Sequence, residues 1–226
     1  MRIDVITLFP EMFAGVLSES ILRIGREKGL IDIRLHNLRD FTVLKHKKVD
    51  DRPFGGGPGM VLMAAPVYNA LKHLEDKEGL KTARKIMLTP QGRTFSQKIA
   101  EDLSKEQNLI LLCGHYEGFD ERILELFEFD EISVGDYVLS GGELPAMTII
   151  DAVSRLVPGV LGNPLSAEQD SFSANKLDFP QYTRPEDFRG LKVPAVLLSG
   201  DHKKIAEWRR HRAEQKTMLK RRDLLK

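Results

Sequence analysis

Three glycine-containing segments of this chain each follow an apolar run and are candidates for ligand binding. They are residues 89–92, 114–118 and 135–142. Ligands of parallel α/β sheets bind outside the carboxyl ends of the strands, so loops at successive strand ends converge on one site. Each segment taken alone is consistent with an ordinary turn. The occurrence of all three at successive strand ends favours a shared binding pocket.

The third of these segments, extended to residues 134–145, is the most informative part of the chain. Its three glycines surround Tyr137, Val138 and Leu139. Glycine lets the backbone approach a ligand closely, and the apolar side chains supply a lining. A connector that only had to turn the chain would not need so many apolar residues. We therefore interpret this segment as a binding loop.

Two charged residues downstream of the loops are candidates for catalysis. Arg155 lies near the end of an apolar, helix-like run, where a cation can also simply interact with the helix dipole. Asp170 lies in a polar segment, and on the residues alone a solvated loop acid or a helix cap is the favoured alternative. His115, beside Tyr116 and Glu117, could act as an acid or base, although a lone loop histidine more often only forms hydrogen bonds.

Other common motifs do not fit. The glycine-rich residues 55–59 lack the Gly-Lys-Ser/Thr of a P-loop and the strand-to-helix context of a dinucleotide fingerprint. The six histidines have no His-x-x-x-His spacing, and the chain has one cysteine, so no metal site is predicted.

Alternating strand and helix patterns over the first 157 residues predict an α/β domain with a mostly parallel sheet. Apolar runs predict strands at residues 3–9, 31–38, 85–89, 109–113 and 129–133. Helices are expected after Pro10 and at residues 65–74, 95–104, 120–127 and 143–157. The inner face of the first helix is predicted to consist of Met12, Leu17, Ile21, Leu22 and Ile24.

The periodic pattern breaks at Pro158 and Gly159 and gives way to a polar stretch rich in turn-forming residues. Long irregular segments in compact chains are usually functional or disordered. We expect an α/β domain over residues 1–160, a linker over 161–180 that carries Asp170, and a helical, basic domain over 181–226.

Composition limits the class of protein. The 226 residues are 42% hydrophobic and 30% charged, as in ordinary globular proteins. No run of 18 apolar residues predicts a membrane span, and the N-terminus lacks the pattern of a secretory signal. The lone Cys113 cannot form an internal disulfide, which agrees with a cytoplasmic location.

The net charge of +1 hides an asymmetry between the two ends of the chain. Residues 201–226 carry ten Lys/Arg and four Asp/Glu, whereas the preceding residues have a net charge of −5. A basic terminal segment indicates either a polyanionic partner or a solvated helix face, and charge alone does not separate these two interpretations.

Seven segments together resemble one known family. They are residues 3–13, 51–60, 89–93, 113–122, 135–145, 170–172 and 182–185. One of them reads Gly-Asp-Tyr-Val-Leu-Ser-Gly-Gly-Glu-Leu-Pro over residues 135–145. In this order, and spread over about four-fifths of the chain, they resemble the bacterial tRNA (guanine-N1)-methyltransferases of the SPOUT superfamily.

The resemblance implies a fold and an activity. The fold is a SPOUT-type, mostly parallel sheet with a trefoil knot toward the end of the α/β domain, followed by a small helical domain. The activity is S-adenosylmethionine-dependent methylation of N1 of the guanosine just 3′ of the tRNA anticodon, position 37. The family also implies a homodimer whose active site is completed across the interface, and assistance by Mg²⁺ without fixed ligands.

Carried over by position, the resemblance assigns roles to individual residues. It implies that the cofactor is bound by Pro90, Gly114, Tyr116, Glu117, Val134, Gly135, Asp136, Tyr137, Val138, Leu139 and Gly141. It implies that Asp170 of the other subunit is the general base and that Arg155 stabilises charge on guanine O6. The tRNA would be held by Arg209, Arg210 and Arg212. His115 stands where the family usually has arginine.

Two other functions remain open at this point. A ribose 2′-O-methyltransferase would share the fold and cofactor but would have no reason for the Asp170-Ser-Phe motif. A non-catalytic RNA-binding module would share the basic end but would not bind S-adenosylmethionine.

Overall fold

The computed structural model describes residues 1–162 and 170–225. It divides into two compact units, Met1–Gly162 and Asn163–Lys226, and each is considered by itself. Residues 163–169 of the expected linker lie outside the described residues.

The first unit is built on a five-stranded sheet whose order is β2-β1-β6-β5-β7. All four neighbouring pairs are parallel. The strands are β1 (Arg2–Thr7), β2 (Asp32–Asn37), β5 (Arg84–Thr94), β6 (Asn108–Cys113) and β7 (Asp130–Ser133). Every strand predicted from an apolar run is present, so the predicted α/β class with a mostly parallel sheet is confirmed.

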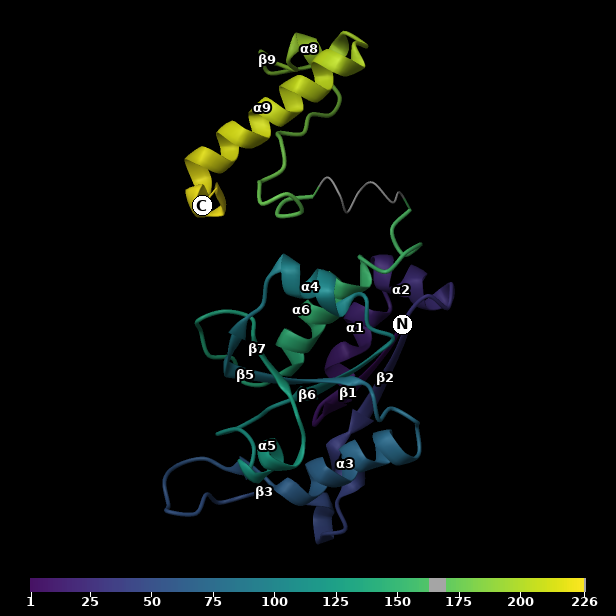
Figure 1. Cartoon of the computed structure of the whole chain (residues 1–226), viewed down its shortest axis with the longest axis vertical. Coiled ribbons are helices and arrows are strands. Elements are labelled where there is room, and N and C mark those ends of the chain that lie inside the picture. Colours follow the sequence, from purple (N-terminus) through teal and green to yellow (C-terminus); the bar gives the residue numbers. More distant parts are fainter. Residues whose placement is uncertain (163–169, 226) are drawn as a thin grey trace. The chain divides into compact units, whose positions relative to one another are not determined.

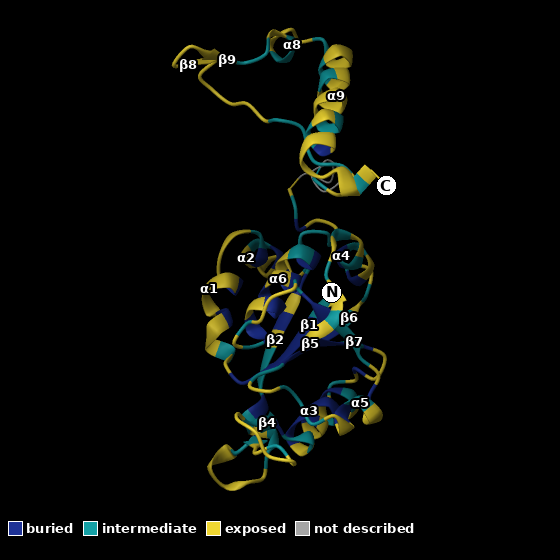
Figure 2. Cartoon of the chain, turned by 90° about the vertical axis from the view of Figure 1, so that its left-hand side faces the viewer, coloured by how far each residue is buried: buried dark blue, intermediate teal, exposed yellow. Residues whose placement is uncertain are grey.

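Helices cover both faces of this sheet (Figure 1). One face packs against α1 (Ala14–Leu17), α2 (Ser20–Glu27), α4 (Gln97–Leu103) and α6 (Glu143–Ser154). The other packs against η2 (Leu38–Phe41), α3 (Ala64–Asp76) and α5 (Arg122–Leu126). Figure 2 shows the resulting buried layer along the strands and the inner sides of these helices. No helix in residues 1–162 or 170–225 has the length and apolar character needed to cross a membrane.

The first helical segment differs from its prediction. It begins as a 3-10 helix, η1 (Pro10–Phe13), continues through α1 and breaks before α2. A single 3.6-residue period therefore does not run through it, and Met12, predicted to face inward, is 46% exposed. Phe13 is buried instead, while Leu17 and Leu22 are buried as predicted.

A small hairpin places the glycine-rich segment next to one of the candidate loops. Strands β3 (Asp50–Asp51) and β4 (Val61–Leu62) pair antiparallel, with residues 52–60 between them and η3 (Lys45–Lys47) just before. The amide of Glu117 donates to the carbonyl of Met60 at 3.0 Å, and the amide of Leu62 donates to the carbonyl of Gly118 at 2.9 Å. The hairpin thus supports the loop that follows β6.

The second unit consists of short elements and one long helix. They are β8 (Asp187–Phe188), β9 (Leu191–Lys192), α8 (Ala195–Leu198), α9 (His202–Lys220) and η4 (Arg222–Leu225). The helical domain expected over residues 181–226 does not begin with a helix, because residues 187–192 form a hairpin. Gly190 adopts φ 85° there, and its amide donates to Asp187 Oδ1 at 2.8 Å.

Among the described residues of this second unit, only Thr217 is buried (Figure 2). Its hydroxyl donates to the carbonyl of Ala213 and accepts from the amide of Leu177, at 2.7 and 2.9 Å. Rings add further contacts, since Tyr182 and Trp208 have centroids 6.2 Å apart. Polar and aromatic contacts, rather than a buried aliphatic core, therefore connect the described elements of this unit.

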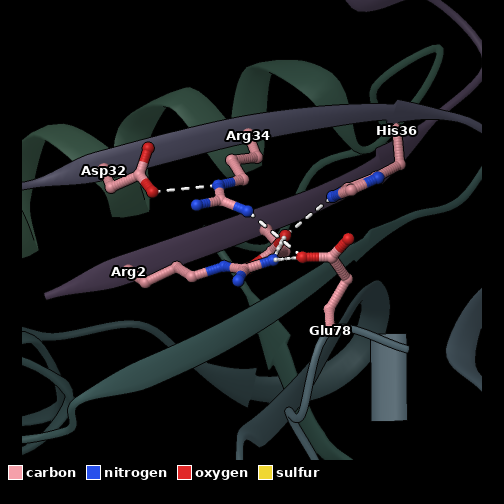
Figure 3. Close-up of polar contacts among 6 residues, drawn as sticks. Arg2, Asp32, Arg34, His36 and Glu78 are labelled. Carbon is pink, nitrogen blue, oxygen red and sulfur yellow. Dashed lines mark hydrogen bonds and ion pairs between the residues drawn. The ribbon is translucent and has the colours of Figure 1, made fainter. Parts of the chain in front are cut away.

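A buried carboxylate lies within the sheet of the first unit. Asp4 on β1 is fully buried and accepts hydrogen bonds from Arg2 Nε at 2.7 Å and Arg2 Nη2 at 2.9 Å. His36 Nε2 lies 2.7 Å from Asp4 Oδ1, the oxygen that also accepts from Arg2 Nη2. Figure 3 shows Arg2, Arg34 and His36 gathered around this point, with Glu78 bridging the two arginines. Burial raises the pKa of Asp4, but the hydrogen bonds from His36 and Arg2 outweigh it and hold that pKa below its ordinary value.

This cluster predicts loss of stability in acid. A carboxyl whose pKa is lowered by folding stabilises the protein above its unfolded pKa of about 4, and that contribution disappears as the pH falls through the folded value. We expect Asp4→Asn to cost about 3 kcal/mol at pH 7, since it breaks a buried pair, and to flatten the acid side of the profile. Urea unfolding between pH 7 and 3 measures both effects. Asp32→Asn, which removes an exposed partner of Arg34, is the matched control and should change little.

Candidate active site

The three candidate loops meet in one cavity. It has a volume of about 320 Å³ and lies where β5 stops pairing with β6, after Leu88, and where β6 and β7 reach their carboxyl ends. Ten of the eleven residues expected at the cofactor line it, namely Pro90, Gly114, Tyr116, Glu117, Val134, Gly135, Tyr137, Val138, Leu139 and Gly141. Asp136 is exposed and is not part of the lining. The structure therefore brings together segments that are up to about fifty residues apart in the chain.

The first wall of the cavity is an unusual continuation of β5. The strand pairs with β7 through Leu88, loses register, and pairs again at Arg93 and Thr94. Residues 89–92 fall in the gap between these two stretches. A side chain at Gly92 would collide with the backbone of Glu131, so the loop approaches β7 too closely for any other residue.

The second and third loops are joined directly through their backbones. The amide of Gly142 donates to the carbonyl of Gly114 at 2.8 Å, and His115 forms an antiparallel bridge with Gly141. A Cβ on Gly142 would lie 2.6 Å from the Cα of Cys113. Glycine at position 142 is therefore required for the two loops to close on each other.

The apolar side chains of the third loop stand out of this wall. Tyr137 is 58% exposed and Val138 is 85% exposed. The hydroxyl of Ser133 holds the start of the loop, because it donates to the carbonyl of Gly135 and accepts from the amide of the same residue, at 3.0 and 3.2 Å. The chain thus exposes large apolar side chains on a loop whose base is fixed.

The cavity is lined by acidic residues. Glu117, Asp120, Glu121 and Glu131 belong to the lining, and no lysine or arginine does among the described residues. A hydrogen bond from Arg122 holds the pKa of Asp120 below its ordinary value, so this carboxyl is ionised at neutral pH. Such a lining favours a ligand that carries positive charge.

One charged residue behind the cavity was not predicted as a site residue. Glu143, at the start of α6, is only 1% exposed. It accepts a hydrogen bond from the Thr7 hydroxyl at 2.6 Å, and its other oxygen lies 3.0 Å from His115 Nε2. The signal in the sequence was an acidic residue placed at the head of an otherwise apolar helix. Burial, together with the charge of Glu143, raises the pKa of Cys113 well above its ordinary value, which disfavours the reactive thiolate.

Of the two catalytic candidates, Arg155 belongs to the unit that holds the cavity but is not part of its lining. Arg155 follows the last residue of α6, whose 12 residues separate it from the cavity end of the helix by about 18 Å. Asp170 belongs to the second unit, where its carbonyl accepts a hydrogen bond from the Ser173 hydroxyl at 2.7 Å. Within one chain, therefore, the structure does not place Arg155 at the cavity.

Comparison with known proteins identifies the family. The family described as "tRNA (Guanine-1)-methyltransferase TrmD" matches residues 1–226. The chain is 58% identical over 225 residues to the tRNA (guanine-N(1)-)-methyltransferase of Geobacillus kaustophilus (strain HTA426), covering 100% of this chain and 91% of the relative. It is 53% identical over 226 residues to the protein of the same name from Clostridioides difficile (strain 630), covering 100% of this chain and 98% of the relative.

This chain belongs to the tRNA (guanine-N1)-methyltransferase family. The resemblance carried by the seven sequence segments is thereby confirmed, and the chain is an enzyme of this class. The mixed α/β architecture with its parallel sheet agrees with that membership.

The arginines predicted to bind the tRNA of this methyltransferase lie on α9. Arg209, Arg210 and Arg212 are all exposed. The guanidinium of Arg209 lies 4.8 Å from the ring centroid of Phe179, and that of Arg212 lies 5.7 Å from the ring of Trp208. Cation–π contacts of this kind orient the side chains while leaving their charge available to an anion.

Metal ligands are not gathered in the described part of the methyltransferase. No group of three or more His, Cys, Asp or Glu residues suited to hold an ion occurs in residues 1–162 and 170–225.

Proposed function

We propose that this methyltransferase transfers the methyl group of S-adenosylmethionine to N1 of the guanosine at position 37 of tRNA. The observation that carries the proposal is the convergence of three separate family motifs on one cavity at the carboxyl ends of the strands. Three motifs that are separate in the sequence would thus contribute to one binding site.

The residues of the cavity fit this cofactor in shape and in charge. The close contact at Gly142 leaves main chain, rather than side chains, to form part of the wall, which suits a bent nucleoside. Glu117, Glu121 and Glu131 give the lining a net negative charge, while Asp120 is paired with Arg122, and this charge suits a donor with a net positive charge. When bound, the donor supplies an electrophilic methyl group on its sulfonium.

The chemistry then requires a base and a stabilising cation. N1 of neutral guanine carries a proton, and we assign its removal to Asp170. As the proton leaves, negative charge spreads to O6, where Arg155 is a permanently charged, planar donor. Holding N1 in line with the methyl group accounts for a further part of the rate.

A second copy of the chain completes the site in this proposal. Arg155 lies about 18 Å along α6 from the cavity of its own subunit, since α6 has 12 residues. A partner subunit is therefore needed to bring an Arg155 and a cavity together. Apolar residues suited to an interface are exposed on the first unit, namely Phe9, Met12, Val16 and Leu144. We assign Asp170 to the partner subunit. The proposal also includes the trefoil knot and the helical domain of the family's fold.

The reaction itself tests the proposal. The purified protein is titrated with S-adenosylmethionine, then incubated with a tRNA transcript that is digested to nucleosides. We expect saturable binding and 1-methylguanosine at position 37. A ribose-methylated product would indicate a 2′-O-methyltransferase, and absence of cofactor binding would indicate a non-catalytic RNA-binding module.

The proposal also includes the cellular location of the reaction and the role of Mg²⁺. We place the reaction in the cytoplasm, where its tRNA substrate is found. We expect Mg²⁺ to assist without fixed protein ligands. No step of the mechanism is assigned to the ion, because the described residues offer no cluster to hold it.

The basic helix α9 is proposed to bind tRNA phosphates. Neutralising Arg209, Arg210 and Arg212 together by glutamine should weaken tRNA binding and reduce the slope of log affinity against log salt by about 2 to 3, because each of the three cations would neutralise one phosphate. Filter binding between 50 and 300 mM salt measures the slope. An unchanged slope would mean that these arginines are only a solvated helix face.

A further inference from the structure

We propose that His115 and Glu143 form a buried latch that holds the second and third loops of the cavity together. The latch is a positioning device, because neither side chain has to touch a reacting atom. Its effect on cofactor affinity rests on the proposed function, whereas its effect on the loops does not.

The latch is a continuous chain of hydrogen bonds. The amide of Phe9 donates to Thr7 Oγ1 at 2.9 Å, so the hydroxyl proton of Thr7 is directed to Glu143 Oε1, 2.6 Å away. Glu143 Oε2 lies 3.0 Å from His115 Nε2. The carboxylate is thus attached to the end of β1 on one side and to the second loop on the other.

Burial makes this chain costly to break. Glu143 is 1% exposed, and the side chain of His115 is 15% exposed. When a buried carboxylate loses a hydrogen-bond partner, the free energy of its desolvation is no longer offset. The ring of His115 is held in addition by Phe9, with centroids 4.9 Å apart in an edge-on arrangement. The carboxylate and the imidazole are therefore fixed in one arrangement.

The position of Gly141 shows that the latch and the third loop are mutually dependent. A Cβ on Gly141 would overlap His115 Nε2 and would lie 2.6 Å from Glu143 Oε2. Only glycine lets the third loop pass over the histidine while the imidazole reaches the carboxylate. Glu143 itself begins α6 directly after this loop, so loss of the latch leaves only the backbone contacts between the second loop and the third, namely the Gly142–Gly114 hydrogen bond and the His115–Gly141 bridge.

The experiment compares variants of the latch in the free protein and with cofactor. His115→Ala and Glu143→Gln remove one partner each, and the double variant completes a thermodynamic cycle. His115→Arg keeps a donor for the buried carboxylate. His73→Ala, an exposed histidine on α3, is the matched control. Hydrogen exchange of residues 114–118 and 139–142 is measured without cofactor, and the Kd for S-adenosylmethionine by calorimetry.

We expect faster amide hydrogen exchange in both loops of either single variant. In the double variant, the increase in exchange rate should be smaller than the sum of the two single effects. The Kd should rise about 10- to 100-fold, the range for losing a charge-assisted hydrogen bond, while kcat at saturating cofactor changes less than the Kd. His115→Arg should restore most of the affinity, and His73→Ala should match the parent protein.

The outcomes separate the latch from the proposed function. Unchanged exchange in both loops would overturn the latch. Faster exchange with an unchanged Kd would overturn its role in cofactor binding. If the parent protein does not bind S-adenosylmethionine and the variants still loosen both loops, the latch stands and the proposed function fails.

Discussion

Asp170→Asn is expected to lower kcat for methyl transfer by about 10²- to 10⁴-fold, the contribution typical of a positioned general base. Asparagine has nearly the same shape as aspartate but cannot accept the N1 proton. The Kd for S-adenosylmethionine should stay within about twofold, because the proposed role of Asp170 is to accept the N1 proton and not to contact the cofactor. Single-turnover transfer to tRNA and calorimetry measure the two quantities.

The matched control for this change is Asp187→Asn in the hairpin of the same unit, where the carboxylate accepts from the amide of Gly190. It should leave kcat unchanged. Turnover of Asp170→Asn close to that of the parent protein would remove Asp170 from the mechanism.

Arg155→Ala is expected to lower kcat by about 10²- to 10³-fold, as does loss of one donor to a developing oxyanion. The planar guanidinium can donate hydrogen bonds to the negative charge on O6, and alanine has no donor to replace them. The measurement is again single-turnover methyl transfer at saturating cofactor and tRNA.

Arg155→Lys separates this role from an interaction with the dipole of α6. A cation at a helix C-terminus contributes about 0.3–1 kcal/mol to stability, and lysine supplies it as well as arginine does. In the catalytic role, lysine lacks the planar donor geometry and should recover only part of the lost rate. Full activity of Arg155→Lys together with lower stability of Arg155→Ala would assign Arg155 to the helix alone.

The sheet and the cavity were predictable because both follow from local patterns and one general rule. Apolar runs such as residues 109–113 fix a buried parallel strand, and the rule for strand ends brings the loops together. The hairpin at residues 187–192 was missed, because the prediction of a helical domain over residues 181–226 did not include the turn that Gly190 allows by its positive φ.

The role of Glu143 could not be predicted, because it depends on a contact across the fold. Thr7 and Glu143 are 136 residues apart, and only the assembled sheet places the end of β1 beside the start of α6. Arg155 and Asp170 are different again. Their roles come from the family resemblance, and within one subunit Arg155 stands at the far end of α6 from the cavity.

The acidic lining of the cavity has a consequence for turnover. Methyl transfer removes the sulfonium charge of the donor, so the spent cofactor is less positive than the one that entered. Under the proposed function, Glu117, Asp120, Glu121 and Glu131 would attract the donor more strongly than its demethylated product for this reason. The carboxylates that favour binding of the donor would therefore also limit inhibition by the demethylated product. They would favour its replacement by a new donor molecule after each turnover.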